Sequence, residues 1–145
     1  MMQLPKQRAK PRRLNLVVLC DISGSMTRYS RMMMHFVHSM AQAQGQSWAE
    51  VHSFTFGTRL HNISPLLTIK DSDAALTAIG SHVRDWEGGT RIATSLGEFN
   101  RHWARRVLST PSVVLLITDG LEREGITQLE AEISRLALQT RELIW

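Results

Sequence analysis

The stretch LNLVVLCDISGS, residues 14–25, decides the fold, because a nearly continuous apolar run ends abruptly in one carboxylate and two hydroxyls. A short continuous apolar run is typical of a parallel strand that helices cover on both faces. Gly24 permits the backbone to bend after the strand, and Ser23 and Ser25 lie two residues apart, so both hydroxyls can face the same way as the Asp21 carboxylate. The sequence predicts a central strand whose carboxyl end presents these three polar side chains together.

A second apolar run, VVLLI at residues 113–117, is followed by Thr118 and Asp119. It predicts another central strand that also ends in a carboxylate. In an open α/β sheet, ligands bind beyond the carboxyl ends of the strands, where the strand order reverses. Asp21 and Asp119 are therefore expected to share one crevice.

The rest of the chain alternates strand and helix patterns, which is typical of an α/β fold. We predict a doubly wound, mostly parallel sheet with one antiparallel edge strand and helices on both faces. The other expected elements are a helix at 26–44, a strand at 51–56, an antiparallel return at 58–63, a helix at 72–83, one helix from Ile92 to Val107, a helix opened by a capping box at 127–130 and a buried strand beginning at 142–145.

The 145 residues predict one domain, at 14–145, preceded by a basic arm at 1–13. The arm holds five basic residues and no acid, so the net charge of +4 arises there and the body is close to neutral. The sequence ends at Trp145, in the strand predicted at 142–145, with no helix after it to cover that side of the sheet. We therefore expect a C-terminally incomplete fold that lacks its last helix, either a fragment or a domain completed by another chain. The single cysteine, Cys20, and the lack of a long apolar segment favour a cytoplasmic protein.

The polar residues at the strand ends suit a hard divalent cation. Mg²⁺ binds about six oxygen ligands and retains some of its waters, so a shallow site of carboxylates and hydroxyls fits it. The Gly88-Gly89-Thr90 turn supplies a further hydroxyl from a separate loop. Each residue alone has a simpler explanation, because hydroxyls at helix starts are common N-caps and strand-end aspartates are common in turns. The combination favours a metal site, whose open position would recruit a carboxylate from a partner protein.

This combination resembles the metal-ion-dependent adhesion site of the von Willebrand factor A (VWA) domain, which has a Rossmann-like fold. Further blocks are similar to the bacterial CoxE-like branch, and the resemblance covers nearly all of the chain from Pro11 onward. The blocks are LCDISGSM at 19–26, FTFGTRL at 54–60, DWEGGTRI at 85–92, TDGLE at 118–122 and RELIW at 141–145. The sequence departs from many VWA domains in having Arg91 after Thr90, where they carry an acid.

The resemblance implies that Ser23, Ser25 and Thr90 bind Mg²⁺ (or Mn²⁺) directly, while Asp21 and Asp119 act directly or through water. It also implies partners, because CoxE-like proteins are typically encoded beside MoxR-type AAA+ ATPases and are implicated in the maturation of metalloenzymes. The expected role is a non-enzymatic adaptor between an ATPase and a client metalloenzyme.

Trp86 and Glu122 flank the predicted site and are candidates for contact with the partner. Packing beneath the loop is the simpler role for Trp86, and a solvated loop is equally consistent with Glu122.

Two other functions stay open at this point. A metal-dependent hydrolase would use Ser23 or a metal-bound water, but the sequence has no Gly-x-Ser-x-Gly elbow or phosphate loop. An RNA-binding module would use the basic arm, and its binding would weaken steeply with salt. His35 and His38 have metal-ligand spacing, but they lie on the polar stripe of the helix predicted at 26–44, where a solvated surface is the better interpretation.

Overall fold

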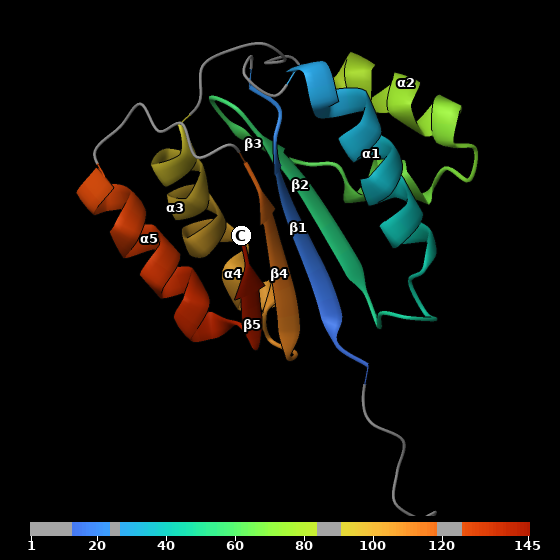
Figure 1. Ribbon diagram of the computed structural model, residues 1–145. Helices are drawn as coiled ribbons and strands as arrows, with labels where there is room; N and C mark the ends of the chain where they lie inside the picture. The colour runs from blue at the N-terminus through green and yellow to red at the C-terminus, as the bar shows by residue number, and fades with distance from the viewer. Residues whose placement is uncertain (1–12, 24–26, 84–90, 119–125) are drawn as a thin grey trace, which may run out of the picture.

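Strand β1 (Asn15–Asp21) is buried along its whole length, as the apolar run predicts. The computed structural model describes residues 13–23, 27–83, 91–118 and 126–145 (Figure 1). The other elements, in chain order, are α1 (Thr27–Gln42), β2 (Val51–Phe56), β3 (Leu60–Asn62), the 3₁₀ helix η3 (Ser64–Thr68), α2 (Ser72–His82), α3 (Ile92–His102), α4 (Ala104–Val107), β4 (Ser112–Ile117), α5 (Ile126–Gln139) and β5 (Glu142–Ile144).

The five strands form one sheet in the order β3-β2-β1-β4-β5. Among the described strands, β1 pairs in parallel with both β2 and β4, β5 is parallel to β4, and the edge strand β3 alone is antiparallel. The chain goes from β1 outward to β2 on one side and later returns to β4 on the other. The strand order therefore reverses between β1 and β4, which confirms the predicted doubly wound sheet. In sheets of this kind, ligands bind beyond the carboxyl ends of the strands at the point of reversal.

Helices lie on both faces of the sheet (Figure 1). α3, α4 and α5 cover the face that carries Val17 and Leu19, while α1, η3 and α2 cover the face that carries Leu16 and Val18. Alternate residues of β1 therefore enter two separate apolar cores, which explains why its sequence is apolar without a polar face. Within the described residues, none of the helices has the length and apolarity needed to cross a bilayer.

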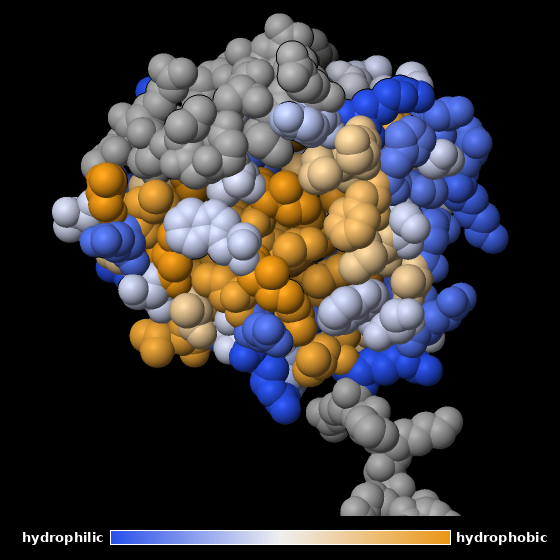
Figure 2. Space-filling model, viewed as in Figure 1, coloured by the Kyte–Doolittle hydropathy of each residue, from blue (hydrophilic) through white to orange (hydrophobic). Residues whose placement is uncertain are grey.

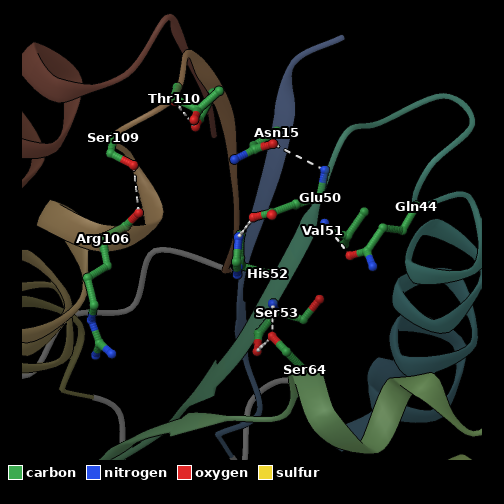
Figure 3. A network of polar contacts seen from close by, with 11 residues as sticks. Asn15, Gln44, Glu50, Val51, His52, Ser53, Ser64, Arg106, Ser109 and Thr110 are labelled. Atoms are coloured by element: carbon green, nitrogen blue, oxygen red, sulfur yellow. Dashed lines mark hydrogen bonds and ion pairs between the residues drawn. The ribbon is translucent and has the colours of Figure 1, made fainter.

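Side-chain hydrogen bonds join the start of β2 to the start of β1 and to the segment after α1 (Figure 3). The side-chain oxygen of Asn15 accepts a hydrogen bond from the backbone amide of Glu50 at 3.1 Å. The side-chain oxygen of Gln44 accepts one from the backbone amide of Val51 at 2.9 Å. These bonds satisfy backbone groups where the strands begin. At this end of the sheet, the Asn15 and Gln44 side chains therefore form hydrogen bonds within the protein.

The helix predicted from Ile92 to Val107 is wrong as a single element, because it is interrupted at Trp103. This residue has φ −120° and ψ −34°, so α3 ends before it and α4 begins after it. The indole ring packs edge-on against Phe54, with ring centroids 5.2 Å apart, and the Arg106 guanidinium lies 4.8 Å from the indole centroid. Trp103 is partly buried and packs against the core that contains Phe54 and Phe99.

The prediction that His38 lies on a solvated surface is also wrong. His38 is buried, and its Nε2 lies 2.8 Å from the carbonyl oxygen of Ile69, to which it donates. One turn later, the amide of Gln42 donates to the carbonyl of Leu67 at 2.9 Å. His38 and Gln42 thus bind backbone carbonyls in and just after η3, a neighbour that a single sequence does not reveal.

Helix α5 begins at Ile126, so Thr127 lies inside its first turn and is not the N-cap that the capping-box pattern predicts. The helix also contains an unexpected buried carboxylate. Glu132 accepts a hydrogen bond from the side chain of Asn100 on α3 at 2.9 Å and pairs with Arg135 at 3.2 Å. This polar contact fixes α5 against α3 on one side of the sheet.

Strand β5 is present, but the prediction that it is buried is wrong. Leu143 is half-buried, whereas Ile144 and Trp145 are 44% and 59% exposed. α1 and α2 lie beside β1 and β2, away from β5 (Figure 1). Apolar side chains consequently gather on the surface between α1 and β5 (Figure 2).

Candidate metal site

The carboxylate of Asp21 is held at the carboxyl end of β1, where it is only 1% exposed. Its Oδ1 accepts a hydrogen bond from the backbone amide of Ser23 at 2.8 Å, and its Oδ2 accepts one from the hydroxyl of Thr118 at 2.8 Å. Thr118 directly follows β4. The ends of the two central strands therefore meet at one carboxylate.

Ser23 is placed by the way the chain leaves the strand. The backbone amide of Ile22 donates to the carbonyl of Phe56 at 2.8 Å, so the chain is still paired with β2 one residue after β1. The next residue turns back, which brings the Ser23 amide onto the Asp21 carboxylate. Ser23 itself is buried. Asp21 and Ser23 are thus the two predicted ligands that the structure brings together.

A third segment is hydrogen-bonded to the sheet at the carboxyl ends of the strands. The backbone amide of Arg91, which precedes α3, donates to the carbonyl of Gly57 at 2.9 Å, and Gly57 directly follows β2. Three segments therefore meet at the carboxyl ends of β2, β1 and β4: the residues after β1, the start of α3 and the end of β4.

Five predicted residues lie outside the described part of the chain, so the structure gives no positions for them. They are the expected ligands Ser25, Thr90 and Asp119 and the expected partner contacts Trp86 and Glu122. Their neighbours Ser23, Arg91 and Thr118 are all described. Within the described ranges, no three His, Cys, Asp or Glu side chains gather where they could hold a metal ion. The predicted donor set, by contrast, consists mainly of hydroxyls.

The environment of Asp21 fits a cation. Its two hydrogen-bond donors, a backbone amide and a hydroxyl, are both neutral, and no described Lys, Arg or His side chain forms an ion pair with it. A buried carboxylate without a countercharge is energetically costly, whereas a bound cation compensates it. Carboxylate and hydroxyl oxygens are ligands that Mg²⁺ and Mn²⁺ prefer.

Sequence reasoning missed the role of Thr118. The residue belongs to the Thr-Asp-Gly block, where attention falls on the aspartate. The parallel pairing of β1 with β4 places Cys20 beside Ile117, so Thr118 is the residue beside Asp21. The sequence shows a hydroxyl residue at the first position after the strand. Its contact with Asp21 can be inferred only once the register of β1 and β4 is known.

The thiol of Cys20, next to Asp21, is expected to be unreactive in the folded protein. Burial, and secondarily the negative charge of Asp21, raise its pKa from 9.0 to about 12. The thiolate fraction near pH 8 therefore falls, and reaction with the thiol reagent DTNB should be at least about 100-fold slower than in urea-unfolded protein. Equal rates in the two states would contradict this burial.

The same pKa shift predicts how stability depends on pH. The folded state holds the proton more tightly than the unfolded state, so this contribution is fully present below the unfolded pKa near 9.0. It is lost as the pH rises towards about 12. Urea denaturation at pH 8 and pH 10.5 should show the loss, and a Cys20→Ala variant should show a smaller one.

Solved structures of VWA-like domains share this fold. Proximal thread matrix protein 1 from the mussel byssus superimposes with a TM-score of 0.60 at 20% identity, over 91% of this chain and 37% of that chain. The same mussel protein with a zinc-occupied MIDAS motif gives a TM-score of 0.60 at 19% identity, over 91% and 37%. A von Willebrand factor type A structure from Catenulispora acidiphila gives 0.62 at 19% identity, over 90% and 32%. The chain spans about a third of the length of these proteins, and the likeness concerns the fold.

No curated protein matches the chain. The family described as "VWA domain containing CoxE-like protein" matches residues 2–145. That match covers almost the whole sequence and agrees with the doubly wound sheet and with the polar residues after β1. The chain belongs to the family of VWA domain containing CoxE-like proteins.

Proposed function

We propose that the chain is a metal-dependent protein-binding module. The observation that carries this proposal is the Asp21 carboxylate, which is buried, joined to the ends of two central strands and compensated only by neutral donors among the described residues. Asp21, Ser23, Ser25, Thr90 and Asp119 would hold Mg²⁺ or Mn²⁺. When bound, the cation supplies a positive charge that can accept a carboxylate from a partner.

The surface beside this edge supports binding to a protein rather than to a small substrate. Helix α1 begins four residues after Ser23, and it exposes Tyr29, Met32 and Phe36 by 45%, 62% and 43%. These residues are spaced three and four apart, so they lie on one side of the helix. Exposed aromatic and methionine side chains are enriched in protein interfaces. They would flank a metal-mediated contact.

The partner that we propose is a MoxR-type AAA+ ATPase, with a metalloenzyme as client, and the setting is the cytoplasm. The CoxE-like family membership supports this pairing. In this role the chain performs no catalysis. Its own residues provide a rigid sheet edge, an oriented carboxylate and an apolar helix surface, and a partner carboxylate completes the contact.

The proposal predicts that partner retention requires both the metal and the serines after β1. Immobilised wild-type chain is incubated with native lysate of the source cells in Mg²⁺ and in EDTA, and the retained proteins are identified by mass spectrometry. A AAA+ ATPase or a metalloenzyme subunit should be retained only in Mg²⁺. A Ser23→Ala/Ser25→Ala variant should lose it, because two of the five proposed metal-binding residues are removed.

The matched control is Ser39→Ala/Ser81→Ala, which removes two exposed hydroxyls from α1 and α2 and should retain the partner like the wild type. Retention that is equal in EDTA and in the Ser23/Ser25 variant would contradict a metal-mediated contact. If nucleic acid is retained, and this retention falls as the salt concentration rises but does not change in EDTA, the RNA-binding alternative would be favoured.

A further inference from the structure

We propose that Thr118 is a positioning residue that orients the Asp21 carboxylate for the metal ion. This inference rests on the proposed metal-dependent function. The two residues are 97 positions apart in the sequence, yet the Thr118 hydroxyl donates to Asp21 Oδ2 at 2.8 Å. The contact joins the ends of β1 and β4, where the strand order reverses.

The two hydrogen bonds on Asp21 restrain its carboxylate together. A single bond to one oxygen leaves the group able to rotate about Cβ–Cγ, whereas separate donors on Oδ1 and Oδ2 fix the plane of the carboxylate. Ser23 supplies a backbone amide to Oδ1, and no substitution of Ser23 other than proline removes that donor. Thr118 supplies the side-chain donor to Oδ2. Each carboxylate oxygen has two lone-pair directions, so one on each remains for a metal or a metal-bound water.

Threonine suits this position because its side chain is stiff. A β-branched residue has restricted χ1 freedom, so the hydroxyl is held in place before any metal arrives. Thr118 directly follows β4, and the register of Cys20 with Ile117 brings it opposite Asp21. Hydrogen-bond partners of metal ligands typically change metal affinity 10- to 100-fold when they are removed.

A purely structural role for Thr118 makes a different prediction. If the hydroxyl only satisfies a buried carboxylate, its removal lowers the stability of the metal-free protein but leaves the metal affinity of the folded protein unchanged. The two roles are separated by measuring metal affinity well below the unfolding temperature, together with the unfolding midpoint without metal.

The test compares Thr118→Val, Thr118→Ser and the wild type by isothermal titration with Mg²⁺ and with Mn²⁺. Valine keeps the shape and removes the donor, so the dissociation constant should rise about 10- to 100-fold. Serine keeps the donor and should bind within about threefold of the wild type. Thr77→Val is the matched control, because the Thr77 hydroxyl donates only to the Asp73 carbonyl of its own helix; its affinity should be unchanged.

Each outcome decides the matter. An unchanged Mg²⁺ and Mn²⁺ affinity in Thr118→Val, with the wild type binding normally, would overturn the positioning role and leave the proposed function intact. A wild type that binds neither ion would overturn both. A loss of affinity in Thr118→Val that serine fails to restore would also count against the positioning role.

Discussion

Asp21→Asn is expected to abolish binding of Mg²⁺ while leaving the metal-free protein as stable as the wild type or more so. Asparagine has nearly the shape of aspartate. Its Oδ1 can accept from the Ser23 amide, and its Nδ2 can donate to the Thr118 hydroxyl, which is able to accept. The substitution therefore keeps both hydrogen bonds and removes a buried negative charge that has no countercharge among the described residues.

Thermal unfolding with and without Mg²⁺ measures both halves of this prediction. A ligand at about 100 times its dissociation constant stabilises a protein by about 2.7 kcal/mol, so the wild type should show a clear rise in the unfolding midpoint. The variant should show none, and its midpoint in EDTA should equal or exceed that of the wild type. A variant that unfolds at a much lower temperature in EDTA would show that the Asp21 charge is needed for folding.

Phe54→Ala is expected to cost about 3–5 kcal/mol of the free energy of unfolding. Phe54 lies in the middle of β2 beside Leu19 and is fully buried. Its ring packs edge-on against Phe99 of α3, with centroids 5.2 Å apart, and against Trp103 at the same distance. Truncation removes both aromatic contacts and leaves a cavity that neighbouring strands cannot fill.

Urea denaturation followed by circular dichroism gives the free energy for this variant. A cost of this size is a large part of the roughly 5–15 kcal/mol that holds a typical domain folded, so partial unfolding at 37 °C is expected. Phe36→Ala is the matched control. Phe36 is 43% exposed on α1, and its truncation should change stability by less than about 1 kcal/mol. Similar costs for the two variants would mean that the core beneath β2 is not packed as described.

The central sheet could be predicted from the sequence because its signals are local. Continuous apolar runs predict β1 and β4, and the strand predicted at 51–56 coincides with β2. The antiparallel return was also predicted correctly. The buried face of His38, the break at Trp103 and the exposure of β5 were not predictable, because each depends on which element packs beside it. A sequence shows that a stripe is polar, but it does not show whether water or a backbone carbonyl lies opposite.

Part of the candidate site could likewise be predicted from local sequence, and part could not. The residue types after β1 predict a carboxylate and hydroxyls at the sheet edge, and the structure places Asp21 and Ser23 there together. Thr118 required the strand register, which no local pattern contains. The assignment of all five residues as metal ligands stays a prediction, and Ser25, Thr90 and Asp119 also lie outside the described part of the chain.

The place of β1 and β4 within the sheet has a mechanical consequence. Both are interior strands, with hydrogen-bonded neighbours on either side. A force applied at Asp21 along the strand direction would load the hydrogen bonds of β1 and β4 in shear, and the bonds of each ladder would share it. A strand at the edge of a sheet, peeled sideways, would lose its bonds one at a time. The proposed metal site thus lies on strands that separate from the sheet only when several hydrogen bonds break together.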